Sequence, residues 1–119
     1  MINIVELFSG VGSQAKAFER LSRKRNFQVN VLKTCEWDVH AIVAYDYIHN
    51  DSALDKRTLG LKKEDLLKEL KKLSLSNDGK VPMKLKTLEA YSTEVLRRIY
   101  SAILKTNNMI SVKDVKGED

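Results

Sequence analysis

The sequence predicts an α/β fold in which parallel strands are connected by helices. An apolar run from Met1 to Phe8 is followed by a turn with two glycines and then by a helical pattern that begins at Ser13. A second run, Phe27 to Cys35, is rich in β-branched residues and precedes another helical pattern, Val39 to His49. Strand, helix and strand within about 35 residues form a βαβ unit, so we expect part of a doubly wound parallel sheet.

The first strand and the helix after it have distinct burial patterns. The strand lacks a clean alternation of polar and apolar residues, which is typical of a strand buried on both faces. In the following helix, Ala17, Phe18 and Leu21 share one face and are expected to pack inward. The end of this helix carries a dense basic cluster, which suits the negative end of the helix dipole and is expected to be solvated: Arg20, Arg23, Lys24 and Arg25.

The turn between the first strand and the first helix is a candidate ligand site. It reads Phe8-Ser9-Gly10-Val11-Gly12, and its two glycines can adopt positive φ and let a ligand approach the bare backbone. Open α/β sheets bind their ligands at the carboxyl ends of the strands, where this turn lies. Continued to Ala15, the turn matches the GxGxxG/A pattern of nucleotide-binding folds. The alternative is a tight turn required only for packing.

The end of the second strand supplies a second candidate site. Glu36 is placed to accept two hydrogen bonds from the ribose hydroxyls of a nucleoside cofactor. The indole of Trp37, next to it, offers a flat face on which adenine can stack. The alternative is a capped helix with a core tryptophan, and Asp38 is the expected N-cap. Cys35 ends an apolar run with no histidine beside it, so we expect a packed core residue and not a nucleophile.

Composition excludes several classes of protein. The formal net charge of +5 permits binding to nucleic acid without requiring it. No apolar run is long enough to span a bilayer and the first residues lack the features of a signal peptide, so we expect a cytoplasmic protein without a membrane partner. A single cysteine excludes an intramolecular disulfide and a cysteine cluster for zinc. His40 and His49 match no ligand spacing and are expected to be surface helix residues, so no metal site is predicted.

Residues from about 51 to 106 form a helical insertion rich in lysine, leucine and acidic residues. Amphipathic spacing predicts a helix from Lys62 to Leu73, a polar turn from Ser74 to Lys80, and a second long helix from Thr87 to about Thr106. Asn107-Asn108 suits the C-terminal cap of the second helix. Several basic residues are candidates for DNA contacts, although they equally suit solvent-facing helix surfaces: Lys84, Lys86, Arg97, Arg98 and Lys105.

Two of these stretches resemble motifs of the cytosine-5 DNA methyltransferases. Glu6-Leu7-Phe8-Ser9-Gly10-Val11-Gly12 is similar to the first motif, an acidic residue followed by Leu-Phe-Ser/Ala-Gly-x-Gly-Gly, with Ser13 in place of the last glycine. Thr34-Cys35-Glu36-Trp37-Asp38, followed by Ala41 and Tyr45, is similar to the second motif. In that family the first motif cradles the methionine end of S-adenosylmethionine. The glutamate of the second motif binds the ribose, and the bulky residue after it packs on adenine.

A third, shorter resemblance lies at the end of the chain. Met109-Ile110-Ser111-Val112 is a candidate third strand, and Asp114 matches the family aspartate that accepts a hydrogen bond from the adenine amino group. Lys113 stands where the family usually has glycine. The resemblance therefore implies S-adenosylmethionine as cofactor and a set of binding residues: Phe8, Ser9, Gly10, Val11, Gly12, Glu36, Trp37 and Asp114.

The resemblance implies that residues 1–119 form the N-terminal part of a Rossmann-like, S-adenosylmethionine-dependent methyltransferase domain with strand order 3-2-1-4. The family nucleophile lies in a Pro-Cys loop, and this sequence contains no Pro-Cys. We therefore expect the chain to lack catalytic residues and to be inactive alone, with double-stranded DNA bound by the full-length enzyme, in DNA modification or restriction-modification. The open edge of the first strand is a candidate for self-association.

Two other functions remain open from the residues alone. One is a dinucleotide-binding Rossmann module, in which the glycine turn holds a pyrophosphate at the helix N-terminus. In such modules the first glycine follows the strand almost directly, whereas Phe8-Ser9 intervene here. The other is a non-catalytic α/β interaction domain, which leaves the glycine turn, Glu36 and Trp37 without a shared purpose.

Overall fold

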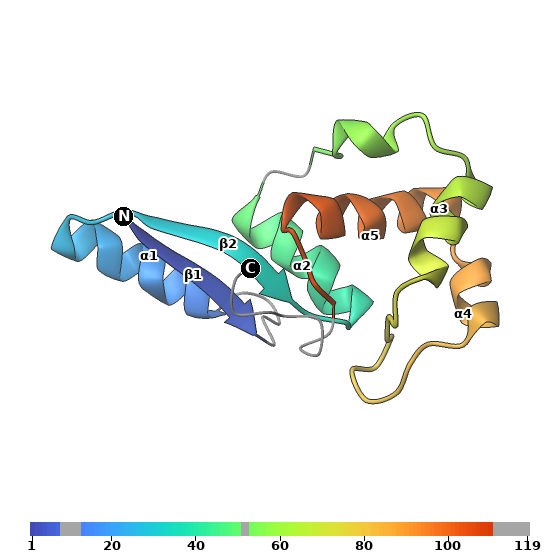
Figure 1. The fold of residues 1–119 in the computed structure, drawn as a ribbon, viewed down its shortest axis with the longest axis horizontal. Helices are drawn as coiled ribbons and strands as arrows, with labels where there is room; N and C mark the ends of the chain where they lie inside the picture. The colour runs from blue at the N-terminus through green and yellow to red at the C-terminus, as the bar shows by residue number, and fades with distance from the viewer. Residues whose placement is uncertain (8–12, 51–52, 111–119) are drawn as a thin grey trace.

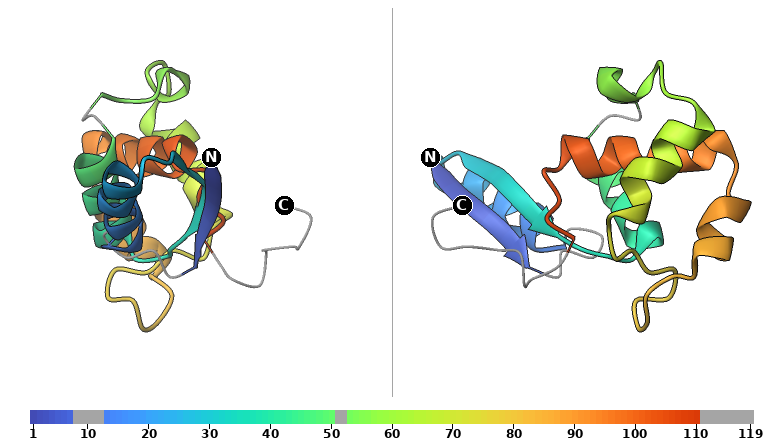
Figure 2. Two further views of the ribbon diagram at one scale, coloured as in Figure 1. Left: turned by 90° about the vertical axis from the view of Figure 1, so that its left-hand side faces the viewer. Right: turned by 45° about the vertical axis from the view of Figure 1, so that its right-hand side comes forward.

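The computed structural model describes residues 1–7, 13–50 and 53–110 (Figure 1). The strands and the first helix form one end of an elongated molecule, and the remaining helices form the other end (Figure 2). The molecule measures 47 × 28 × 25 Å along its principal axes. The elements in chain order are β1 (Ile2–Leu7), α1 (Ser13–Arg25), β2 (Val29–Cys35), α2 (Val39–His49), the 3₁₀ helix η1 (Lys56–Thr58), α3 (Lys63–Lys71), α4 (Leu85–Ala90) and α5 (Thr93–Lys105).

The βαβ unit predicted from the sequence is present. β1 and β2 are parallel neighbours, with Ile2 opposite Val29 and Leu7 opposite Cys35. The register shifts by one residue between Ile4 and Val5, where the pairing of the two strands is irregular. α1 connects the two strands and lies along one face of the sheet (Figure 1). The fold of the described residues is therefore α/β with a two-stranded parallel sheet.

The candidate third strand does not begin at Met109 as predicted. Met109 and Ile110 lie outside any strand, and Ile110 has a φ of 65°, which takes the backbone out of the extended region. The amide of Met109 nevertheless donates to the carbonyl of Thr34 at 2.9 Å. The segment before residue 110 thus lies beside β2, on the side away from β1 (Figure 1). Residues 111–112 of the candidate strand lie outside the described residues.

The sheet is more exposed than its apolar sequence predicts. Within β1 only Glu6 is buried, while Val5 and Leu7 are 40% and 44% exposed. The expected inner face of α1 is also open, since Phe18 and Leu21 are 37% and 44% exposed. Strands lie about 4.8 Å apart, so two strands are too narrow to cover a helix about 10 Å wide. In the described part of the chain, no second layer covers the other face of the sheet.

The hydrophobic core lies instead among the helices of the insertion. Its fully buried side chains include Leu66 and Leu70 of α3 and Leu96 of α5, each 0% exposed. α2 joins this core through Val39 and Ile42. α5 is central because it packs against α2, α3 and η1 (Figure 2). Most of this core therefore comes from the segments in which amphipathic spacing predicts helices, although Val95, which that spacing places on the inner face, is 43% exposed.

The predicted long helix from Thr87 is two helices. α4 ends at Ala90, Tyr91 has an extended backbone, and α5 begins at Thr93. The hydroxyl of Ser92 accepts a hydrogen bond from the amide of Val95 at 3.2 Å, which caps α5. The expected stop after α5 is confirmed, because Asn107 adopts the left-handed conformation with a φ of 50°. Across the ranges that the structure describes, no helix combines the length and the apolarity needed to cross a membrane.

Candidate functional site

The two sequence motifs meet at the carboxyl edge of the sheet. Leu7, the last residue of β1, is the Cα partner of Cys35, the last residue of β2. β1 therefore ends next to the residue that precedes Glu36, and α1 begins at Ser13. Residues 8–12 themselves lie outside the described residues, as does Asp114. Of the predicted cofactor-binding residues, Glu36 and Trp37 are the two that the structure describes.

The carboxylate of Glu36 turns back onto the two residues that lead into α2. Its Oε2 atom accepts hydrogen bonds from the amides of Trp37 and Asp38, at 3.0 and 2.9 Å. Asp38 is the N-cap, as predicted, because its Oδ1 atom accepts from the amide of His40 at 2.9 Å. A carboxylate has about four acceptor positions, so these two backbone contacts are compatible with hydrogen bonds to two ribose hydroxyls. The contacts fix where the Glu36 side chain lies, at the end of β2.

Trp37 lies at the junction between the sheet edge and the helical core. Its side chain is half-buried and packs against the core cluster. Its carbonyl accepts from the amide of Ser76 at 2.8 Å, and the carbonyl of Ser76 accepts from the amide of Val39 at 2.8 Å. The indole is therefore supported from one side by the helices. Partial burial of this kind suits a stacking platform and also the alternative of a core tryptophan.

The polar turn that supports Trp37 is held by its own side chains. The hydroxyl of Ser76 donates to the carbonyl of Val81 at 2.6 Å, and the carboxylate of Asp78 accepts from the amides of Lys80 and Val81. These amide contacts hold the pKa of Asp78 below its usual range. Gly79 has a φ of 75°, a conformation that favours glycine. The turn predicted over Ser74 to Lys80 is confirmed, but its role beside the site was not predicted.

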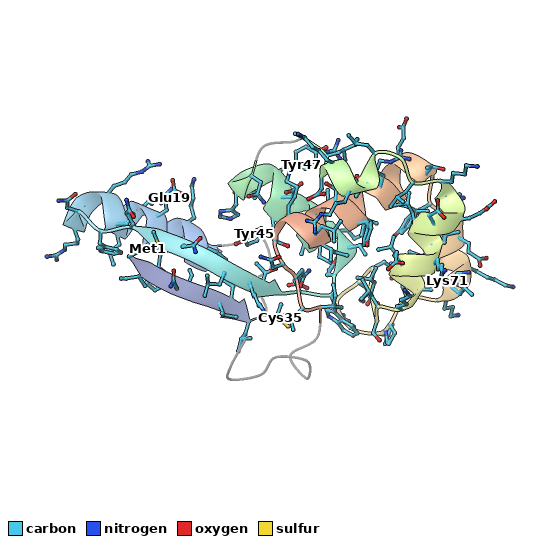
Figure 3. The ribbon with its side chains drawn as sticks, turned by 45° about the horizontal axis from the view of Figure 1, so that its top comes forward. Met1, Glu19, Cys35, Tyr45, Tyr47 and Lys71 are labelled. Carbon is cyan, nitrogen blue, oxygen red and sulfur yellow. The ribbon has the colours of Figure 1, made fainter. Side chains whose placement is uncertain are left out.

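Glu6 of β1 and Tyr45 of α2 are both buried. Glu6 is 2% exposed and Tyr45 is 5% exposed. Burial raises the pKa of Tyr45 above its ordinary value, and the charge of Glu6 raises it further. Cys35 is also buried at 2% exposure, which confirms the prediction of a packed residue. Figure 3 shows Cys35 at the end of β2 and Tyr45 on α2.

A hollow of about 330 Å³ opens between α1, β2, α2 and the end of α5. Its lining includes Thr34, Tyr45 and His49 but neither Glu36 nor Trp37. His49 is partly exposed, and its ring centroid lies 4.3 Å from that of Tyr45. His40 is exposed, as predicted. Among the described residues, no group of histidine, cysteine and acidic side chains is arranged to hold a metal ion.

Two of the basic residues considered for DNA contact have structural roles instead. Arg97 donates to the carbonyls of Thr58 and Leu61, at 3.1 and 2.6 Å. Lys105 forms an ion pair with the buried Asp46. Lys84 and Lys86 are exposed, as is the whole predicted basic cluster at the end of α1. The cluster is therefore exposed to solvent, as a solvated helix end requires.

No protein-family model matches the chain. Comparison with curated proteins shows that the chain is similar to a methyltransferase over nearly its whole length, which confirms the resemblance that the motifs indicate. The relative is the orphan methyltransferase M.SssI of Spiroplasma monobiae (strain ATCC 33825 / MQ-1). The two sequences are 28% identical over 117 residues, which are 96% of this chain and 30% of the relative. The chain thus spans less than a third of the length of this methyltransferase.

Proposed function

We propose that this chain is the cofactor-binding part of a DNA cytosine-5 methyltransferase. S-adenosylmethionine supplies the methyl group when it is bound, and carbon 5 of cytosine in double-stranded DNA accepts it. The residues described here bind and orient the cofactor. The nucleophile and the groups that recognise DNA belong to other parts of such an enzyme, because the sequence contains no Pro-Cys.

One observation carries the proposal. Glu36 follows β2 directly, beside the point where the glycine turn leaves β1, and its carboxylate is held in place by two backbone amides. Cofactors of open α/β folds bind at this edge of the sheet. The similarity to a methyltransferase favours S-adenosylmethionine over a dinucleotide.

Each site residue has a separate role in the proposal. The Glu36 carboxylate accepts hydrogen bonds from the two ribose hydroxyls, and the exposed face of Trp37 packs on adenine. The turn at residues 8–12 holds the methionine end, and Asp114 accepts from the adenine amino group. In this arrangement the described residues bind and position the cofactor, and none of them reacts with the cytosine.

The experiment is a titration with S-adenosylhomocysteine, carried out on the protein that carries this chain. Glu36→Gln is preferred to Glu36→Ala, because glutamine retains an oxygen that can accept from the amides of Trp37 and Asp38. Loss of the charged acceptor should weaken binding by about 1.5 to 3 kcal/mol. Trp37→Ala should weaken binding by about 1 to 3 kcal/mol through lost stacking.

Glu64→Gln is the matched control, because Glu64 is an exposed residue in the first turn of α3. This variant should bind as the unaltered protein does. Unchanged affinity in Glu36→Gln and Trp37→Ala, with normal thermal unfolding, would remove the site assignment. Tighter binding of NAD than of S-adenosylhomocysteine would favour the dinucleotide alternative.

A further inference from the structure

The side chain of Asn108 holds the main chain of Glu36 at two points. Its Oδ1 atom accepts from the Glu36 amide at 3.0 Å, and its Nδ2 group donates to the Glu36 carbonyl at 2.9 Å. The same Oδ1 atom accepts from the amide of Ile110 at 2.9 Å. The Asn108 amide thus occupies the place that a peptide group of a neighbouring strand would take. The two residues are 72 positions apart in the sequence.

Residues 107–109 run along the edge of β2 that faces away from β1. The Asn107 side chain donates to the carbonyl of Leu32 at 3.2 Å, and the Met109 amide donates to the carbonyl of Thr34 at 2.9 Å. Together with the contacts of Asn108, these hydrogen bonds hold the segment after α5 against every second residue of the chain along β2: Leu32, Thr34 and Glu36. Only the Asn108 contacts involve the residue that carries the proposed ribose acceptor.

The backbone at Glu36 decides where its carboxylate lies. Oε2 contacts the amides of the next two residues, so the side chain turns back over the start of α2. A rotation of the peptide groups on either side of Glu36 would move the Cα–Cβ bond and carry the carboxylate away from the sheet edge. Asn108 restrains both of these peptide groups, since it binds the amide on one side and the carbonyl on the other.

We propose that Asn108 is a positioning residue for Glu36 and thereby raises the affinity of the cofactor site. This inference rests on the proposed function, because it assumes that Glu36 binds the cofactor. Asn108 itself touches no cofactor in the proposal. It couples the end of the insertion to the site, so that the orientation of Glu36 depends on a residue after α5.

A purely structural role would consist of anchoring the insertion to β2. Asn107 provides the matched control, because its side chain makes the same kind of contact four positions before Glu36, at Leu32. Its left-handed φ of 50° is best kept by glycine, so Asn107→Gly removes the side chain without straining the backbone. Asn108→Ala removes the contacts to Glu36.

The test is a double-mutant cycle in the protein that carries this chain, with the affinity for S-adenosylhomocysteine measured by calorimetry. Asn108→Ala should weaken binding about fivefold or more, whereas Asn107→Gly should change it less than about twofold. In a Glu36→Gln background, Asn108→Ala should cause no further loss, because the group that it positions is already impaired. Thermal unfolding of each variant shows how much anchoring is lost.

Equal affinities for Asn108→Ala and Asn107→Gly would overturn the inference, as would fully additive losses in the double variant. Should Asn108→Ala fail to fold, Asn108→Asp replaces it, since aspartate keeps the acceptor for the Glu36 amide and loses the donor to the Glu36 carbonyl. Its affinity should lie between those of the unaltered protein and Glu36→Gln, and an unaltered affinity would contradict positioning. Failure of the proposed function is recognised separately, because Glu36→Gln alone would then bind normally.

Discussion

The ammonium group of Lys105, in the last turn of α5, lies 3.1 Å from the Oδ1 atom of Asp46 in α2. The Asp46 side chain is 1% exposed, and that of Lys105 is 16% exposed. Lys105 also donates to the carbonyl of Ala53 at 2.7 Å, and Asn50 donates to the Asp46 carboxylate at 3.0 Å. This buried ion pair ties the helix that follows Glu36 to the helix that precedes Asn108.

Removal of the cation should destabilise the protein strongly. Lys105→Met keeps most of the side-chain length but leaves the Asp46 carboxylate buried without its cation, which should lower the free energy of unfolding by about 3 to 5 kcal/mol. Denaturant unfolding measures the change. Lys68→Met, at an exposed position of α3, is the control and should stay within about 0.5 kcal/mol. Equal stability of the two variants would contradict the prediction, and adding Asp46→Asn to Lys105→Met should restore part of the loss.

The boundary between α4 and α5 depends on Ser92. Ser92→Ala removes the acceptor for the Val95 amide and should cost about 1 kcal/mol of stability. Ser92→Asp retains a capping oxygen and should remain close to the unaltered protein. Thermal unfolding of the two variants provides the measurement. If alanine and aspartate at this position gave the same stability, the side-chain cap would not be the cause of the boundary.

Helix bounds and caps could be predicted from the sequence better than the burial of the sheet. The bounds of α2 and the Asp38 cap were predictable, because a cap and an apolar pattern coincide there. The Ser92 cap was missed, because apolar residues at helical spacing continue on both sides of it. The exposure of β1 could not be predicted from its residues. Its apolar composition is typical of a strand covered on both faces, but composition does not say how many strands the described residues form. Asn108 carries no local signal, since its partner Glu36 is 72 positions away.

Acidic pH should weaken the start of η1. The Arg57 guanidinium makes two contacts of 2.9 Å with the Asp55 carboxylate and lowers the pKa of that carboxyl to about 2. Because the folded pKa lies below the ordinary value of 3.8, the stabilisation is complete above the ordinary pKa and is lost as the pH falls toward the folded one. Arg57 is 65% exposed, so the contribution should be on the order of 1 kcal/mol after screening by water.

Asp55→Asn provides the test of this pH dependence. Asparagine keeps an acceptor for the Arg57 amide, so the variant isolates the charge. The difference in unfolding free energy between Asp55→Asn and the unaltered protein should be constant above about pH 5 and should disappear near about pH 2. A difference that did not change across this range would show that the carboxylate charge contributes nothing.

The sheet end of the molecule should associate with other chains. In the described residues β1 pairs only with β2, so its second edge carries backbone groups that a further strand can pair with. The exposed side chains of Val5, Leu7 and Phe18 add apolar surface beside that edge. Sedimentation of the 119-residue chain should therefore reveal concentration-dependent association.

Hydrogen exchange tests the same prediction at the level of single amides. At low concentration the amides of Ile2–Leu7 should exchange faster than those of Val29–Cys35, and association should slow them. Val5→Lys places a charge on the exposed face and should reduce association. A monomer at all concentrations with equal protection in both strands would contradict a role for this edge.

The Glu36–Asn108 contact also bears on how such a chain can change over evolution. The chain leaves the sheet just after Glu36 and returns to it at Asn108, so the two ends of the helical part lie at one point on the sheet. A segment with adjacent ends can be lengthened, shortened or exchanged without displacing the strands on which it sits, and the entropic cost of a longer loop grows only slowly with its length. Genes for this architecture can therefore acquire or lose whole helices between these two residues while the sheet edge keeps its shape.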